Sequence, residues 1–179
     1  MTTFVALLRG VNVGKTKRVP MVEFRRLLAG LGHTDVATLL NSGNAVFRSK
    51  SVATPRIASG IAQAISRKLK VDVPVIVKSA KELTAIVAGN PFQVGPADHS
   101  RFLVAFTQEA ESLEDLAAIA PLVTPPERFA IGRHAAYLHC ADGILKSKAG
   151  EALLGRIGRR ATTRNLATTL KLQALAGKP

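Results

Sequence analysis

The chain has 179 residues, and its proportions of 47% hydrophobic and 21% charged residues exclude wholesale disorder. Its 25 Lys and Arg against 12 Asp and Glu give a net charge of +13, which attracts polyanions, phosphorylated ligands or acidic partners unless the cations are merely solvated. The single cysteine, Cys140, excludes an internal disulfide and a multi-cysteine zinc site. We expect a cytoplasmic protein, because no apolar run is long enough to span a membrane and the first residues do not resemble a signal peptide.

Short strands and helices alternate in the first half of the chain. Pro20 suits the first turn of a helix, because its missing N–H costs nothing there. The turn at 41–43 between two apolar runs predicts a hairpin, and Ser79 with Glu82 predicts a capping box. The expected elements are a strand at 3–8, a helix at 20–31, strands at 35–40 and 44–49, a helix at 54–70, a strand at 73–78 and a helix at 79–87.

The second half repeats this order, with Ser147 as an N-cap. The expected elements are a strand at 101–106, an acidic helix at 109–120, strands at 127–132 and 135–140, a helix at 148–157, an extended piece at 161–162 and a last helix at 164–176. The first six elements of each half are those of the ferredoxin-like βαββαβ unit. We therefore predict an α+β protein of two ferredoxin-like halves, residues 1–92 and 93–179, each with an added helix and related by pseudo-duplication.

Chain topology predicts which segments meet. In a ferredoxin-like unit the third strand lies between the parallel first and second strands, so the loop after the first strand and the turn between the second and third share one end of the sheet. We therefore expect residues 9–18 beside residues 41–44. By the same logic, residues 140–148 and 162–165 share one end of the second sheet.

Several short motifs occur together along the chain: LRGVNVG at 8–14, VPM at 19–21, SGN at 42–44, NPF at 90–92, YLH at 137–139 and TTRN at 162–165. In combination they resemble the bacterial family known as domain of unknown function 1697. The resemblance covers nearly the whole chain and implies two ferredoxin-like halves, in agreement with the element order. It implies no activity, because none is assigned to that family.

The resemblance also implies a set of polar positions that could hold a ligand. They are Arg9, Gly10, Asn12, Gly14, Ser42, Gly43, Asn44, Ser147, Lys148, Thr163, Arg164 and Asn165. The chain departs from the family's usual residues at Leu166, where Trp is common, at Ala149, where Leu is common, and at 140–141, where an aromatic-Pro pair is common. Any stacking role of that Trp is lost.

The loop after the first strand is the strongest candidate site. Residues 10–16 look like a phosphate-binding P-loop, but three residues instead of four separate the glycines, Arg9 stands where the loop needs glycine, and no helix follows directly. A weaker interpretation remains, in which Gly10, Asn12 and Gly14 permit unusual backbone angles and leave N–H groups free to face an anion. The cations that would accompany them are Arg9, Lys15, Lys17 and Arg18. The alternative is a structural turn with solvated cations.

Two further segments carry polar groups. Residues 42–44 could present amides and a hydroxyl to the same ligand, although Gly and Asn are also ordinary residues of a hairpin turn. Residues 163–165 would begin the last helix, where Arg164 places a cation at the positive end of the helix dipole. A buried partner such as Glu151 or Asp142 would compensate it, or a bound phosphate or carboxylate.

The residues give little support for a metal site, a catalytic site or a base-stacking surface. The four His residues show no metal-ligand spacing, and His139 and Cys140 would point to opposite faces of a strand. We therefore expect no metal and no cofactor, and no catalytic machinery is visible. RNA-binding modules of this fold stack bases on aromatic residues of their central strands, where this chain offers only Phe4 and Phe47.

The sequence therefore predicts a basic protein that binds nucleic acid or a phosphorylated small molecule through the 9–18 loop and the 42–44 turn. One alternative is an enzyme acting on a phosphorylated or carboxylated substrate. Another is a structural or interaction protein, because the charge is segregated. The net charge is +10 over residues 1–90, −5 over 91–127 and +8 over 128–179. In that case the acidic segment at 109–115 would meet a basic face of a second copy.

Overall fold

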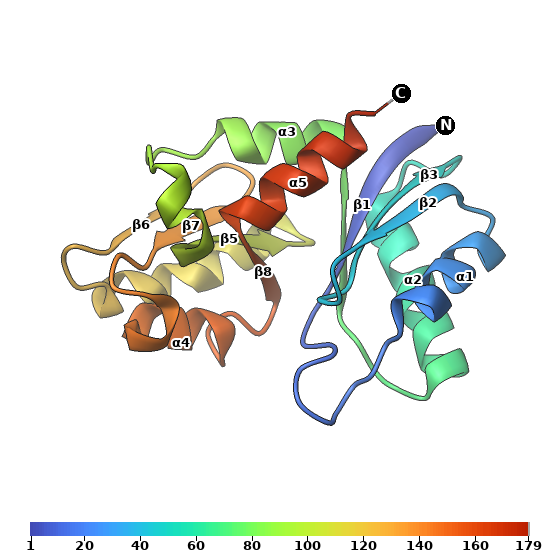
Figure 1. Ribbon diagram of the computed structural model, residues 1–179, viewed down its shortest axis with the longest axis horizontal. Coiled ribbons are helices and arrows are strands. Elements are labelled where there is room, and N and C mark those ends of the chain that lie inside the picture. The colour runs from blue at the N-terminus through green and yellow to red at the C-terminus, as the bar shows by residue number, and fades with distance from the viewer. Residues whose placement is uncertain (179) are drawn as a thin grey trace. The chain divides into compact units, whose positions relative to one another are not determined.

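A computed structural model describes residues 1–178, which form two four-stranded antiparallel sheets with accompanying helices (Figure 1). The elements of the first half are β1 (Thr2–Leu8), α1 (Met21–Gly30), β2 (Thr34–Leu39), β3 (Asn44–Ser49), α2 (Thr54–Leu69), β4 (Val75–Ser79) and α3 (Ala80–Ala88). Those of the second half are the 3₁₀ helix η1 (Pro96–Arg101), β5 (Phe102–Thr107), the 3₁₀ helix η2 (Ala110–Leu122), β6 (Arg128–Ile131), β7 (Ala136–His139), the 3₁₀ helix η3 (Ile144–Lys146), α4 (Lys148–Leu154), β8 (Ala161–Asn165) and α5 (Leu166–Ala176).

Both sheets have the same topology. The strand order is β2-β3-β1-β4 in one sheet and β6-β7-β5-β8 in the other, and all neighbours are antiparallel. This is the order of the ferredoxin-like unit, so the predicted α+β class with two such halves is confirmed. By its contacts the chain divides into a first unit, Met1–Leu83 with the residues from Leu172 onward, and a second unit, Thr84–Lys171. Helices α3 and α5 therefore each contribute residues to both units.

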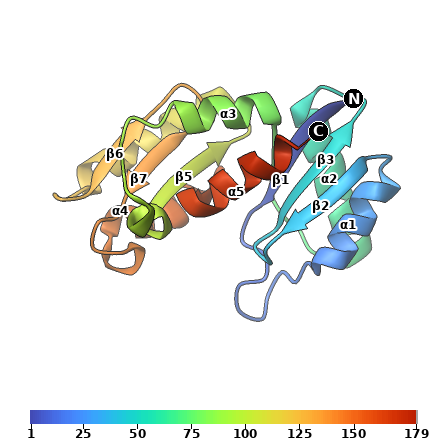
Figure 2. The same cartoon turned by 45° about the horizontal axis from the view of Figure 1, so that its top comes forward.

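Helices α1 and α2 lie side by side on one face of the first unit's sheet (Figures 1 and 2). Ile57, Ile61 and Ile65 recur every four residues along α2 and are buried with Phe24 and Leu28 of α1. They pack against alternate residues of β1, which all point to the same face of the sheet. Each such side chain contributes about 1.5–3 kcal/mol through its burial.

The predicted caps are confirmed. The Ser79 hydroxyl accepts a hydrogen bond from the Glu82 N–H at 3.1 Å, and the Glu82 carboxylate accepts one from the Ser79 N–H at 2.8 Å, which completes a capping box at α3. The Ser147 hydroxyl accepts from the Gly150 N–H at 2.8 Å and caps α4. Local signals of this kind position both helices, although α4 ends at Leu154, three residues earlier than predicted.

The acidic segment differs from the α-helix that the sequence predicts. Residues 110–122 form successive 3₁₀ turns, and Pro121 lies inside the element instead of ending it. Leu113, Leu116 and Ile119 are buried at intervals of three residues. That spacing matches the three residues per turn of a 3₁₀ helix, which aligns these side chains in one row against the core.

Within residues 1–178 there is no helix with the length and apolar character that crossing a membrane requires.

Candidate functional site

The 9–18 loop and the turn between β2 and β3 lie at the same end of the first sheet, as the topology predicts. The Leu8 N–H donates to the Gly43 carbonyl at 2.8 Å. The Asn12 side-chain amide donates to the Asn41 carbonyl at 2.6 Å. The segment before β4 reaches the same end, because the Arg9 N–H donates to the Pro74 carbonyl at 3.0 Å.

Asn12 fastens the base of the loop. Its Nδ2 donates to the carbonyls of Val19 and Asn41, and its Oδ1 accepts from the Val19 N–H at 2.9 Å. Its backbone has φ of 58°, a left-handed conformation that Asn tolerates better than most residues. The Asn12 amide is therefore used within the protein, and it holds the two ends of the loop together.

The polar groups of the turn are also engaged by the protein itself. Asn44 is fully buried, and its Nδ2 donates to the Leu39 carbonyl at 2.8 Å and to the Ser42 hydroxyl at 2.9 Å. Gly43 has φ of 83°, and a Cβ added there would lie 2.6 Å from the Leu8 Cβ. The turn is therefore built for close packing against β1, and it supports the loop.

The cations of the loop remain at the surface. Lys15, Lys17 and Arg18 are exposed, and none of them forms an ion pair within residues 1–178. Arg9 is half-buried, and this burial lowers the pKa of its guanidinium. A shallow cavity of about 510 Å³ lies beside the loop, with Lys17 and Asp72 among its lining residues. This end of the sheet is thus strongly cationic.

The loop backbone is also unusual. Gly10 and Gly14 have φ of 66° and 64°, and Lys17 has φ of 49°. The loop therefore passes through the left-handed region at several separated residues, Asn12 among them. Left-handed residues next to ordinary ones turn successive N–H groups toward a common side, an arrangement that can face an anion.

The structure corrects the placement of Arg164. Strand β8 runs to Asn165, and α5 begins at Leu166, so Arg164 is on a strand and not in the first turn of a helix. The cap of α5 is Asn165, whose Oδ1 accepts from the Thr168 N–H at 2.8 Å. The boundary moves because Asn165 is as good an N-cap as the threonines before it.

The Arg164 guanidinium is nearly buried, and that burial lowers its pKa to about 10. Its Nη1 donates to the Thr162 hydroxyl at 2.9 Å and to the Thr163 carbonyl at 2.8 Å. Ser147 is buried as the cap of α4, whereas Lys148 is exposed. The strand pairs Phe102–His139 and Leu103–Asn165 place the ends of β7 and β8 at the same end of the second sheet, as predicted.

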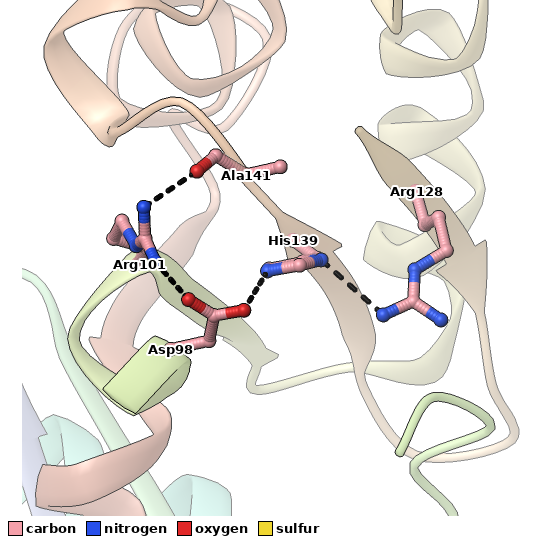
Figure 3. Close-up of polar contacts among 5 residues, drawn as sticks. All are labelled: Asp98, Arg101, Arg128, His139 and Ala141. Atoms are coloured by element: carbon pink, nitrogen blue, oxygen red, sulfur yellow. Dashed lines mark hydrogen bonds and ion pairs between the residues drawn. The ribbon is translucent and has the colours of Figure 1, made fainter. Parts of the chain in front are cut away.

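A polar cluster that sequence reasoning missed lies in the second unit (Figure 3). Nε2 of the buried His139 is 3.2 Å from Oδ2 of Asp98, within reach of a charge interaction but without a hydrogen bond, and Nδ1 is 3.3 Å from Nη2 of Arg128. Arg101 pairs with Asp98 and donates to the Ala141 carbonyl at 2.7 Å. The cluster ties η1 to β6 and β7. Both ring nitrogens face protein groups, so His139 is not placed as a base for a substrate.

The chemistry available elsewhere is limited. Burial raises the pKa of the Cys140 thiol, and a hydrogen bond with Ser147 offsets this only in part. Cys140 is fully buried, so it is a poor nucleophile. In the described part of the chain no group of three His, Cys, Asp or Glu side chains is placed to hold a metal ion.

Comparisons with known proteins agree with this architecture. The family model described as "Protein of unknown function (DUF1697)" matches residues 1–137. The solved structure of the conserved bacterial protein SP0830 from Streptococcus pneumoniae is similar over 98% of each chain, with a TM-score of 0.81 and 23% sequence identity. At that identity the likeness shows the fold alone. No functionally curated protein matches the chain.

Proposed function

We propose, on the premise that the chain belongs to the DUF1697 family of proteins of unknown function, that it binds the phosphate backbone of nucleic acid through its 9–18 loop. The observation that carries this proposal is the group of three exposed cations, Lys15, Lys17 and Arg18, without ion pairs in the described chain. Unneutralised cations on one loop attract a polyanion and release its counterions on binding. A cytoplasmic location is part of the proposal, since the partner is intracellular.

The way the loop is held supports this proposal. The Asn12 amide and the packing around Gly43 fix the base of the loop. Less ordering is then required when the loop meets a partner, which favours binding. The 42–44 turn contributes support, whereas the cations make the contact.

An extended partner fits this site better than a small molecule. The Asn12 and Asn44 amides, which would otherwise position a small phosphorylated substrate, are spent on the protein's own carbonyls. The backbone N–H of Asn12, expected to face an anion, donates instead to the Lys17 carbonyl at 3.1 Å. The contact then rests mainly on the exposed cations, which suit phosphates without reading base sequence. We therefore expect weak sequence preference and steep dependence on salt. The enzyme alternative has no geometric observation in its favour.

The test replaces the three cations together: Lys15→Gln, Lys17→Gln and Arg18→Gln. Glutamine keeps the side chains long and leaves the left-handed backbone at residue 17 as strained as before. Binding of labelled single-stranded and duplex oligonucleotides of mixed sequence is measured by fluorescence anisotropy over a range of salt concentrations. For the duplex we expect the slope of log affinity against log salt to become shallower by about 2 to 3, since each phosphate contact contributes about 0.9.

A control variant separates the loop from the overall charge. Arg25→Gln, Lys81→Gln and Lys171→Gln remove three exposed cations elsewhere. This variant should bind nearly as well as the wild type, because its losses are not gathered at one site. Equal losses in both variants, or no loss in the loop variant, would show that the loop is not the binding site.

A further inference from the structure

A groove between α1 and α2 is a second surface feature of the first unit. It has a volume of about 580 Å³, and its apolar lining includes Leu27 of α1, Leu31 directly after α1 and Ala64 of α2. Leu31 is 38% exposed, and Leu27 is partly exposed beside it. The groove therefore presents apolar surface that the chain's own packing leaves open.

The charges at the groove are mostly basic and lie toward one end. Arg67 and Lys68 line it from the last turn of α2, and neither forms an ion pair within residues 1–178. Arg26 lines it from α1 and pairs with Glu23 at 2.6 Å. Strands β1 and β3 are antiparallel, and the helix after each strand runs back over the sheet, so α1 and α2 are antiparallel to each other. Arg67 and Lys68, at the end of α2, therefore lie toward Glu23, near the start of α1. The groove is thus cationic at one end and apolar at the other.

The acidic segment has the opposite pattern. In a 3₁₀ helix residues three apart are aligned, so Glu111, Glu114, Ala117 and Ala120 form one row along η2, which we name the acidic ridge. All four residues are exposed. Neither Glu111 nor Glu114 has an ion pair in the described part of the chain. The ridge therefore carries two free carboxylates at one end and two small apolar side chains at the other.

We propose that the groove between α1 and α2 binds the acidic ridge of a second copy of this chain. Glu111 and Glu114 would meet Arg67 and Lys68, while the alanines approach the apolar lining. The charges balance, with a net +2 from the groove's four charged residues against −2 from the ridge. The small alanine side chains allow close approach, and the glutamates lie about 6 Å apart along the helix axis. This use of the acidic segment is independent of the nucleic-acid site.

The test is a reciprocal charge swap. One variant reverses the groove with Arg67→Glu and Lys68→Glu, and the other reverses the ridge with Glu111→Lys and Glu114→Lys. All four side chains are exposed, so both variants should fold, which far-ultraviolet circular dichroism checks. Mass in solution is followed by sedimentation near 0.1 M salt, where the Debye length is about 10 Å and repulsion between the net positive molecules is largely screened.

We expect the wild type to self-associate with rising concentration and each variant alone to remain monomeric, because each then faces like charges. An equimolar mixture of the two variants should associate again, since both of its contacts pair opposite charges. Arg25→Glu with Lys81→Glu is the matched control and should associate as the wild type does. A wild type that stays monomeric, or a mixture that fails to associate, would overturn the proposal.

Discussion

The segment that follows the first strand of each sheet has opposite charge in the two units. After β1, residues 9–18 contain four cations and no acid, and after β5, residues 108–122 contain four acids and no cation. Both connections are held by buried apolar residues, Val11 and Val19 in the first and the row from Leu113 to Ile119 in the second. The fold therefore requires buried apolar residues in this segment but no particular charge. The charged side chains are then available for binding.

Both units also bury polar groups. In the first unit the fully buried Asn44 donates to the Leu39 carbonyl, and the buried Lys78 pairs with the Glu82 carboxylate at 3.8 Å. In the second unit the buried Arg164 donates to the Thr162 hydroxyl and the Thr163 carbonyl, and the ring of His139 is buried near Asp98. A buried charge costs several kcal/mol unless it is well paired. Both units thus bury a cation, Lys78 in the first and Arg164 in the second, and both contain a closely packed glycine, Gly43 in the first and Gly158 in the second.

The largest effect among these predictions is expected from Gly43→Ala in the first unit. The added Cβ would lie 2.6 Å from the Leu8 Cβ and 2.8 Å from Val11 Cγ2, at a φ of 83°. The left-handed backbone costs about 1–2 kcal/mol and overpacking about 1–3 kcal/mol more. We expect the free energy of unfolding to fall by about 2–5 kcal/mol, measured by urea denaturation followed by circular dichroism.

Gly14→Ala is the matched control for that substitution. Its φ of 64° is equally left-handed, but a Cβ there would meet no atom within 4 Å. It should cost only the backbone strain of about 1–2 kcal/mol. Similar losses in both variants would show that the close contact of Gly43 with Leu8 and Val11 adds nothing to the backbone strain.

Burial of the Tyr137 hydroxyl in the second unit should make the protein less stable in alkaline solution. Burial raises the pKa of Tyr137 to about 12, and its hydroxyl donates to the Ile86 carbonyl at 2.5 Å. Between pH 10 and 12 the unfolded chain loses a proton that the folded chain keeps, so stability falls as the pH rises. The loss should approach about 2–3 kcal/mol by pH 12, since one pKa unit corresponds to about 1.4 kcal/mol.

Tyr137 is the single tyrosine of a chain without tryptophan, so tyrosinate absorbance reports this group alone. The folded protein should show almost no tyrosinate near pH 11, and Tyr137→Phe should flatten the alkaline part of the stability profile. If Tyr137 of the folded protein titrated at the ordinary pKa of tyrosine, burial would not shield its hydroxyl from water.

Local patterns predicted most of the fold because strands, caps and turns depend on residues close in sequence. The capping box at Ser79 and the hairpin at 41–43 are examples. The 3₁₀ helix was predictable in principle, because the strict spacing of three from Leu113 to Ile119 fits three residues per turn better than 3.6. The end of β8 was missed because Thr163 and Asn165 are both suitable caps.

The candidate site was predictable only in part. Topology brought the 9–18 loop to the turn, but the sequence could not show that the Asn12 amide is spent on carbonyls at Val19 and Asn41. Whether a donor is free depends on acceptors from distant segments. The cluster of Asp98 and His139 was missed for the same reason, since its members are far apart in the chain.

The smallest effect concerns Ser147 and Lys148, which the family resemblance offers as ligand contacts. The fold buries Ser147 but leaves Lys148 exposed. Ser147 is buried as the cap of α4, so Ser147→Ala should lower the free energy of unfolding by about 1 kcal/mol, whereas Ser147→Gly should lower it by only a few tenths. Lys148 is exposed, and Lys148→Ala should leave stability unchanged within about 0.5 kcal/mol. Thermal unfolding of the three variants measures these differences. If Ser147→Ala were as stable as the wild type, its hydroxyl would not be needed for the cap, and Ser147 would again be a candidate ligand contact.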